Sequence, residues 1–250
     1  MLVKTEGIVI RNRDYGEGNK IITIFSLELG KIAMMARGAK KPKSRLSSSS
    51  QLFTYGSYLI HKGTGANSMG SLSQGEIIES FRDLRQDLAK TAYASYFVEL
   101  LDKLIEDGER SPSLFRLLHK ALQYVNEGKD AEIIARLYEI KLLSISGYRP
   151  ELDKCVHCSG IDEIHSFSVM EGGFICNRCL TFDPRHTVLQ PAVIKILRLL
   201  YHVDIERIGN INVKKETKDQ ICRLLWSFMD HHTPLRLKSR SFIEQMKDFL

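Results

Sequence analysis

The sequence predicts an α+β chain, in which a small β-rich part at the N-terminus precedes a helical part with a four-cysteine insert. Short apolar runs rich in Ile, Val, Phe and Tyr alternate with turn residues from residue 2 to about residue 80. From residue 81 onward, apolar residues recur at helical spacing. Four of the five cysteines lie between residues 150 and 184. Strands that precede helices, rather than alternating with them, indicate separate domains.

The β-rich part is expected to form five strands without an intervening helix. A barrel or a sandwich of this size would satisfy that pattern. Turn signals separate the runs at residues 15–19, 29–30 and 63–67. The predicted strands are Lys4–Ile10, Lys20–Leu27, Lys31–Ala36, Leu52–His61 and Ser71–Ser80.

The remaining chain is expected to be helical on both sides of the cysteine insert. One long helix should run from Leu84 to about Asp107, a second should start at Ser111-Pro112, and Asp130 should cap a third that stops at Gly147. Later helices are predicted at Pro191–His202, Glu216–His232 and Ser241–Phe249. The expected domains are therefore residues 1–80, a helical domain in two parts (81–149 and 185–250) and an insert at 150–184.

Composition excludes several broad classes of protein. The chain has 250 residues, 43% of them hydrophobic, which is ordinary for a globular protein. Charged residues near Met1 argue against a signal peptide, and no apolar window reaches the ~18 residues of a membrane span. We therefore expect a cytoplasmic protein with no membrane partner and with reduced cysteines.

Positive charge is concentrated at the N-terminal end. Residues 1–50 carry ten bases and four acids, which accounts for the whole net charge of +6. Between Glu28 and Glu76 there are seven Lys or Arg and no acid. The β-rich part should therefore attract a polyanion.

The densest basic stretch is Arg37–Arg45, which has five bases in nine residues. Pro42 and the charge exclude a strand interior, so a loop or an exposed turn is expected. Lysines among small residues suit contacts with phosphates, whereas a solvated loop without function is the alternative. Phe53 and Tyr55 are predicted to share a strand face and could stack unpaired bases, with Tyr58 on the other face; core packing is the alternative.

The cysteines form two Cys-x-x-Cys pairs, Cys155/Cys158 and Cys176/Cys179, separated by 17 residues. Each pair presents two thiolates to one ion, and together they complete a tetrahedron, so one structural Zn²⁺ is predicted. The residues between them should form a hairpin. Disulfides or buried thiols are the alternatives, and a catalytic zinc is disfavoured because four thiolates leave no position for water.

Other nearby residues are expected to play no part in metal binding. His157, His165 and His186 should be surface or supporting residues, and Cys222 should be a small buried side chain in a helix.

No motif indicates an enzyme. The pairs Gly30-Lys31 and Gly128-Lys129 lack the rest of a phosphate-binding loop, and Gly63–Gly70 lacks the third glycine of a dinucleotide loop. A Gly-x-Ser-x-Gly elbow is also missing. We expect a non-catalytic protein; a zinc-dependent hydrolase or nuclease is the disfavoured alternative.

Taken together, the sequence resembles the bacterial recombination mediator family RecO over essentially its whole length. The N-terminal segments Glu6–Arg11, Asp14–Glu17 and Asn19-Lys20 are similar to its opening strands. Ala36–Leu46 is similar to its most specific motif, and Cys155–Cys179 to its zinc knuckle.

The resemblance implies an OB-fold barrel in residues 1–80, followed by the helical domain with its zinc insert. It implies binding to single- and double-stranded DNA, annealing of complementary strands, and a cytoplasmic, nucleoid-associated location. Implied partners are RecR, the acidic C-terminal tail of the single-stranded DNA-binding protein and, indirectly, RecA, which is loaded onto covered single strands during repair. The expected DNA-binding residues are Arg11, Arg13, Lys20, Arg37, Lys40, Lys41, Lys43 and Arg45.

A second functional class remains open. The chain could be a zinc-containing interaction scaffold whose basic patch binds acidic protein tails instead of DNA.

Overall fold

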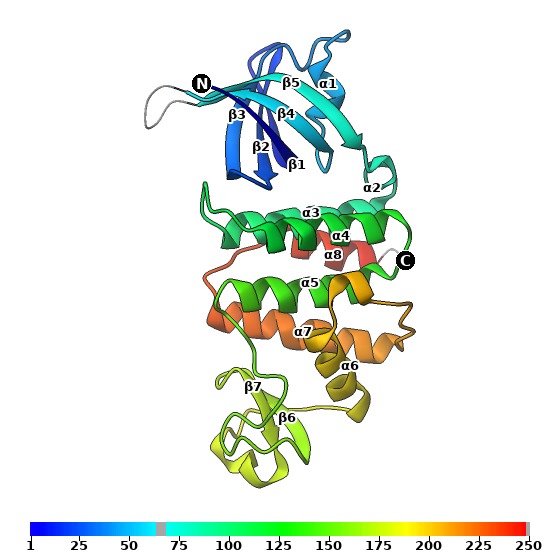
Figure 1. Cartoon of the computed structure of the whole chain (residues 1–250). Helices are drawn as coiled ribbons and strands as arrows, with labels where there is room; N and C mark the ends of the chain where they lie inside the picture. Colours follow the sequence, from blue (N-terminus) through cyan, green and yellow to red (C-terminus); the bar gives the residue numbers. More distant parts are fainter. Residues whose placement is uncertain (64–68, 249–250) are drawn as a thin grey trace. The chain divides into compact units, whose positions relative to one another are not determined.

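The N-terminal strands close into a five-stranded barrel in the computed structural model, which describes residues 1–63 and 69–248 (Figure 1). The neighbour order is β1-β2-β3-β5-β4, and β1 also pairs with β4. Among the described strands of the barrel, only β3 and β5 pair in parallel, over two residue pairs. This arrangement is the OB-fold, so the predicted fold class is confirmed. The strands are β1 (Leu2–Tyr15), β2 (Asn19–Ser26), β3 (Gly30–Ala36), β4 (Tyr55–His61) and β5 (Gly70–Glu79).

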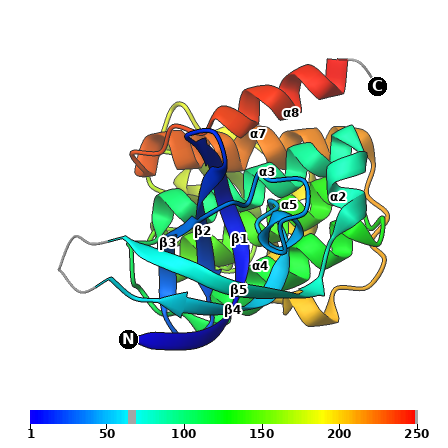
Figure 2. The same ribbon diagram turned by 90° about the horizontal axis from the view of Figure 1, so that it is seen from above.

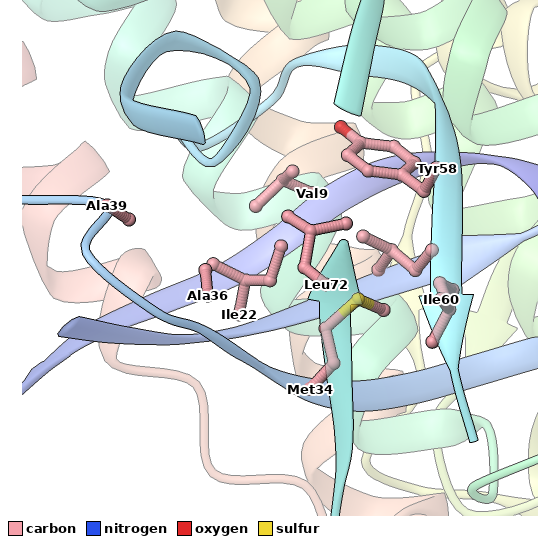
Figure 3. Packing of buried hydrophobic residues seen from close by; sticks show 9 residues of the cluster. Val9, Ile22, Met34, Ala36, Ala39, Tyr58, Ile60 and Leu72 are labelled. Carbon is pink, nitrogen blue, oxygen red and sulfur yellow. The ribbon is translucent and has the colours of Figure 1, made fainter. Parts of the chain in front are cut away.

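Alternation along the strands builds the core of the barrel. Side chains of one parity point inward, because successive residues of a strand face opposite sides. Figure 3 shows this packing, in which Met34 and Leu72 meet between the walls of the barrel. The buried cluster contains Val9, Ile22, Ile24, Met34, Ala36, Ala39, Tyr58, Ile60 and Leu72. Residues of the other parity therefore form the outer face.

β1 forms part of two walls of the barrel. Its first half pairs with β4 and its second half with β2 (Figure 2). The register with β2 shifts between Val9 and Arg11, which marks a bulge. Bulges bend the strand and increase its local twist. After the bulge, Arg11 lies opposite Thr23 and Arg13 lies opposite Ile21. These two bases of β1 therefore lie on the outer face of the barrel, beside β2.

The strand predictions hold except at certain ends. β1 continues to Tyr15 rather than ending at Ile10, because it pairs with β2 up to the turn. β4 begins at Tyr55 instead of Leu52, since Phe53 has a φ of 71° and cannot continue a strand. A short helix that was not predicted, α1 (Leu46–Ser49), precedes it. The predicted turn at 63–67 and the glycine-rich stretch 63–70 lie largely outside the described residues.

The predicted long helix is wrong in one respect, because it is broken at Asp87. Asp87 has extended backbone angles (φ −108°, ψ 128°), and its carboxylate accepts a hydrogen bond from the Lys90 backbone N–H. This is an N-cap, which a continuous helix could not accommodate. The segment therefore forms α2 (Arg82–Gln86) and α3 (Leu88–Leu104). α4 (Pro112–Asn126) starts at Ser111-Pro112 as predicted.

The chain divides into two compact units. The first contains residues 1–128 and 237–250, that is, the barrel, α2, α3, α4 and the C-terminal α8 (Lys238–Asp248). In this unit α8 lies against α3, where the Glu99 carboxylate accepts hydrogen bonds from the backbone N–H groups of Lys238 and Ser239 at 3.0 and 2.8 Å. The helix predicted at residues 241–249 begins at Lys238 instead. Phe249 lies outside the described residues.

The second unit contains residues 129–236. Asp130 caps α5 (Ala131–Ile145) as predicted, and α6 (Pro191–His202) and α7 (Lys215–His232) pack with it. The insert and the residues just after it form a three-stranded sheet of β6 (Ile164–Ser168), β7 (Gly173–Cys176) and β8 (Thr187–Val188), with the 3₁₀ segment η1 (Asn177–Phe182) between β7 and β8. A second 3₁₀ segment, η2 (Ile205–Arg207), follows α6. The predicted division into residues 1–80, 81–149, 150–184 and 185–250 stays a prediction.

Candidate nucleic-acid interface and metal centre

The outer face of β1, β2 and β3 carries a hollow of about 430 Å³, which we call the β2–β3 hollow. Apolar side chains form part of its lining, and Arg11 and Arg13 stand on its β1 side. The face of strands 2 and 3 is where OB-folds commonly bind oligonucleotides. Its lining residues are Ile10, Arg11, Asn12, Arg13, Ile21, Thr23, Ala33, Leu52 and Met69.

A second hollow of about 420 Å³ lies beside the first, and Met69 lines both. We call it the loop hollow, because it lies between the β1–β2 turn and the ends of β4 and β5. Arg37 and Lys62 bring positive charge to it, and Tyr15 brings an aromatic ring that is 54% exposed. Its lining residues are Tyr15, Asn19, Met35, Arg37, His61, Lys62, Gly63, Met69, Gly70 and Ser71.

The basic segment, residues 37–45, is a series of turns, as predicted. Two hydrogen bonds fix its start to the β1–β2 turn. The Lys40 backbone N–H donates to the Gly18 carbonyl at 3.1 Å, and the Gly38 N–H donates to Asn19 Oδ1 at 2.9 Å. Charged side chains separated in sequence are thereby held at one end of the barrel.

Lys40 is partly neutralised by a neighbour. Its Nζ lies 2.7 Å from Asp14 Oδ2, and this hydrogen bond with the Lys40 ammonium lowers the pKa of the Asp14 carboxyl. Because the side chains of Lys40 and Asp14 are 32% and 62% exposed, water screens the pair, which is of the weakly stabilising surface kind. A phosphate could therefore compete with Asp14 for Lys40.

The eight predicted DNA-binding bases differ in their surroundings. Arg11 pairs with the buried Asp102 of α3, and Lys40 pairs with Asp14. Within the part of the chain that the structure describes, the other six make no ion pair. They are Arg13, Lys20, Arg37, Lys41, Lys43 and Arg45. Arg11, Arg13 and Arg37 line the two adjacent hollows, whereas Arg45 lies apart, on the wall formed by β4 and β5.

Lys31 belongs to the acid-free stretch but not to this surface. It is 7% exposed, and its Nζ donates to the carbonyls of Asp102 and Ile105 at 2.9 and 2.7 Å. Asp102 and Asp107 carboxylates lie 3.4 and 3.1 Å away. Lys31 therefore joins β3 to the C-terminal end of α3, where a cation is favourable.

Of the two interpretations of Phe53 and Tyr55, base stacking or core packing, the structure supports core packing. Phe53 is 1% exposed, and the Tyr55 ring packs edge-on against Phe115 and His119 of α4 at centroid distances of 5.8 and 4.9 Å. Burial, followed by a hydrogen bond to the Glu6 carboxylate, raises the pKa of Tyr55. Both rings are therefore packing groups, Tyr55 against α4 and Phe53 in the interior just before β4.

Sequence reasoning missed the contributions of Tyr15, His61 and Lys62. In the sequence, Tyr15 belongs to the turn signal at residues 15–19 and to the segment Asp14–Glu17, and Lys62 is one of the seven bases of the acid-free stretch. Tyr15 ends β1 before the β1–β2 turn, and His61 and Lys62 lie where β4 ends before the β4–β5 connection. Because these two connections border the OB-fold binding face, such positions could have identified the three residues.

The four predicted cysteines form one cluster. Their sulfur atoms all lie within 4.8 Å of one another, and Cys158 Sγ is 3.6 Å from Cys176 Sγ. Tetrahedral Zn–S bonds of ~2.3 Å would place the sulfurs about 3.8 Å apart. None of the four is in a disulfide. The donor set therefore fits a metal ion held by four thiolates, with no open position.

The thiols of this cluster differ in acidity. Burial opposes ionisation of Cys155, but hydrogen bonds from the backbones of Cys158, Cys176 and His157 lower its pKa to about 6. Burial and the neighbouring thiols raise the pKa of Cys179 to about 12. A metal ion would therefore bind Cys155 mainly as a thiolate that is already deprotonated, whereas its binding to Cys179 would release a proton.

A hairpin joins the two cysteine pairs, as predicted, with β6 and β7 as its strands. Ser168, where β6 ends, donates to Asp183 Oδ2 at 2.5 Å, and the Arg185 backbone N–H donates to Asp183 Oδ1 at 2.9 Å. These two hydrogen bonds lower the pKa of Asp183, and the bond from Ser168 has the larger effect. They fix the segment after the second cysteine pair to the turn of the hairpin.

The histidines near the cluster have other roles. His157 stacks on Phe182 with ring centroids 4.4 Å apart, and His186 Nδ1 lies 2.7 Å from the Asp183 carbonyl. The described residues offer no histidine to the cysteine cluster, in line with the prediction. Cys222 lies on α7 and is half-buried, so it is less enclosed than expected.

Comparison with known proteins agrees with this architecture. Residues 1–81 match the family model described as "Recombination protein O N terminal", and residues 85–241 match "Recombination protein O C terminal". The second match alone covers more than half of the chain. The chain belongs to the RecO family.

RecO proteins of known sequence are similar over their full length. The DNA repair protein RecO of Halalkalibacterium halodurans is 48% identical over 247 residues, covering 99% of this chain and 96% of the relative. That of Bacillus cytotoxicus is 49% identical over 249 residues, covering 100% and 99%. The predicted resemblance is thus confirmed, and membership of this DNA repair family agrees with the expected non-catalytic role. No helix among residues 1–63 and 69–248 has the length and apolar character needed to cross a membrane.

Proposed function

We propose that this RecO chain is a recombination mediator that binds DNA along the β2–β3 hollow, the loop hollow and the basic segment. On this proposal it anneals complementary single strands and, with RecR, helps RecA to assemble on single strands covered by the single-stranded DNA-binding protein. It acts in the cytoplasm at the nucleoid. The observation that carries the proposal is the group of unpaired bases around two adjacent hollows on the OB-fold face.

The charges explain how annealing can proceed without a catalytic residue. Lys and Arg that contact phosphates release condensed counterions and reduce the repulsion between two strands. Because phosphates carry no sequence information, such binding is largely independent of sequence. Tyr15, exposed beside the loop hollow, could stack one unpaired base. Arg13, Arg37, Lys41 and Lys43 are the bases most available for phosphates, with Lys20, Lys40, Arg11 and Arg45 around them.

The metal in this proposal is one structural Zn²⁺ held by Cys155, Cys158, Cys176 and Cys179. A four-thiolate set is typical of structural zinc, and such a site contributes to folding rather than to chemistry. The acidic tail of the single-stranded DNA-binding protein is a proposed partner for which no residues are named. An interaction scaffold that binds acidic tails in place of DNA is the alternative.

The decisive test removes unpaired bases of the basic segment. The variant Arg37→Ala/Lys41→Ala/Lys43→Ala should bind single-stranded DNA more weakly, because up to three phosphate contacts are lost. The slope of log affinity against log salt should become shallower by about 2, since each single-strand contact contributes ~0.7. Fluorescence anisotropy with oligothymidylate at several salt concentrations measures this slope.

A control with equal loss of charge uses exposed bases of the helical part, Lys103→Ala/Arg110→Ala/Arg116→Ala. Its slope should stay that of the unsubstituted protein. An unaltered slope in the first variant would refute the proposed interface, and a wild-type protein that binds only acidic peptides would favour the scaffold.

A further inference from the structure

The barrel has a third depression, on the wall opposite the proposed interface. It has a volume of about 490 Å³ and lies over β4 and β5, and none of its lining residues lines either of the other two hollows. We call it the β4–β5 groove. It is lined by Lys4, Arg45, Leu46, Ser57, Leu59, Ser73, Gln74, Gly75 and Glu76.

Strand register explains why this groove is separate. Lys4 of β1 lies opposite Leu59 of β4, which in turn lies opposite Gln74 of β5, so the three side chains form one row on the outer face. Lys4 is in the half of β1 that pairs with β4, whereas Arg11 and Arg13 are in the half that pairs with β2. The bend of β1 thus places bases on two different walls.

Two residues that line the groove are bases with no ion-pair partner among the described residues. They are Lys4 and Arg45, and both are exposed. In the next row of the outer face, Glu6 of β1 lies opposite Ser57 of β4, which in turn lies opposite Glu76 of β5. A phosphate chain would therefore follow the Lys4 row and avoid the Glu76 row. Ser73 and Gln74 add hydrogen-bonding groups on that side.

The basic segment connects this groove with the loop hollow. Its first residue, Arg37, lines the loop hollow, and its last, Arg45, lines the β4–β5 groove. The exposed Lys41 and Lys43 lie between them in the chain. One short stretch of chain therefore supplies bases to both walls and to the path that joins them.

We propose that the β4–β5 groove binds a second nucleic-acid single strand through Lys4 and Arg45, so that one molecule can hold two strands and bring them together along the basic segment. This inference rests on the proposed DNA-binding function and adds to it a second site. Two strands on one protein meet at a high effective concentration, which accelerates pairing without any bond being made or cut in the protein.

The test uses the zinc-loaded full chain and the groove variant Lys4→Glu, which leaves every base of the first interface in place, with Lys103→Glu as the control of equal charge change. At low salt, oligothymidylate titration should give about two strands per wild-type or control molecule and about one per groove variant. Annealing of complementary oligonucleotides should be slower in the groove variant by about tenfold or more. Its affinity for the remaining strand should change by less than about threefold, since the first interface is intact.

The outcomes separate the two proposals. A wild-type protein that binds no strand at all refutes the proposed function. A wild-type protein that saturates with one strand, or a groove variant that anneals as fast as the control, overturns the second site alone. If an acidic peptide binds the wild type but not the groove variant while strand stoichiometry stays at one, the groove is an acidic-peptide site and the inference is wrong. Thermal unfolding of each variant verifies that it is folded.

Discussion

At the scale of single residues, a base contributes to binding only if its charge is not already satisfied. Lys31 and Lys41 both come from the acid-free stretch, but Lys31 is buried among α3 carbonyls and carboxylates, whereas Lys41 is exposed. Removing a buried cation leaves Asp102 with fewer partners in a place that water reaches poorly. The same substitution should therefore have opposite consequences at the two positions.

We expect Lys31→Met to lower the free energy of unfolding by about 3 kcal/mol, because it breaks a buried charge pair and two hydrogen bonds. Lys41→Met should change stability by less than ~0.5 kcal/mol. Conversely, only Lys41→Met should reduce the salt slope of DNA binding, by about 0.7. Urea unfolding and anisotropy titrations measure the two quantities. Equal stability of the two variants would contradict the structural role of Lys31.

At the scale of elements, the cysteine insert is stabilised by more than its metal ligands. Asp183 is 5% exposed and accepts hydrogen bonds from Ser168 and from the Arg185 backbone. Since these bonds favour the carboxylate, the pKa of Asp183 in the folded protein lies below its ordinary value. Its contribution to stability is therefore complete above the unfolded pKa of ~3.9 and is lost as the pH falls through the lower folded pKa.

Asp183→Asn should accordingly destabilise the insert by about 1–2 kcal/mol at neutral pH, because charge-assisted hydrogen bonds are replaced by weaker ones. The difference in unfolding free energy between the variant and the wild type should be constant between pH ~7 and ~5, since the folded and unfolded pKa values of Asp183 both lie below that window. Urea unfolding of metal-loaded protein across this range measures it. A difference that already shrinks at pH ~6 would mean that another group controls this contact.

At the scale of the whole molecule, the proposed DNA site and the metal centre belong to different compact units. The hollows and the basic segment lie within residues 1–80 of the first unit, while the four cysteines lie in the second. Each unit has a buried core of its own. Loss of the metal should therefore affect the two units unequally.

Purified protein should contain about one zinc per chain, and a chelator should remove it with a fall in the thermal stability of the second unit. The salt slope of single-strand binding should shift by less than ~0.7, the value of one phosphate contact. Metal analysis, thiol titration and anisotropy check these points. If chelation abolished DNA binding, the metal centre would have to support the barrel after all.

The sequence by itself determined the order of the elements, the barrel followed by helices, and the four cysteines that meet in space. Alternation, helical spacing, caps such as Asp130 and the Cys-x-x-Cys pairs are local signals, and each persists in the folded chain. The helix break at Asp87 was missed because a cap within an apolar pattern resembles an ordinary acidic residue.

Only the tertiary structure decided which bases are free and which aromatic rings are covered. Lys31 and Arg45 have the same formal charge, yet one is buried against α3 and the other lines the β4–β5 groove. Tyr55 and Tyr15 are equally aromatic, yet α4 packs on the first and leaves the second exposed. The physical reason is that exposure and ion pairing depend on neighbours distant in sequence, which periodicity along the chain does not encode.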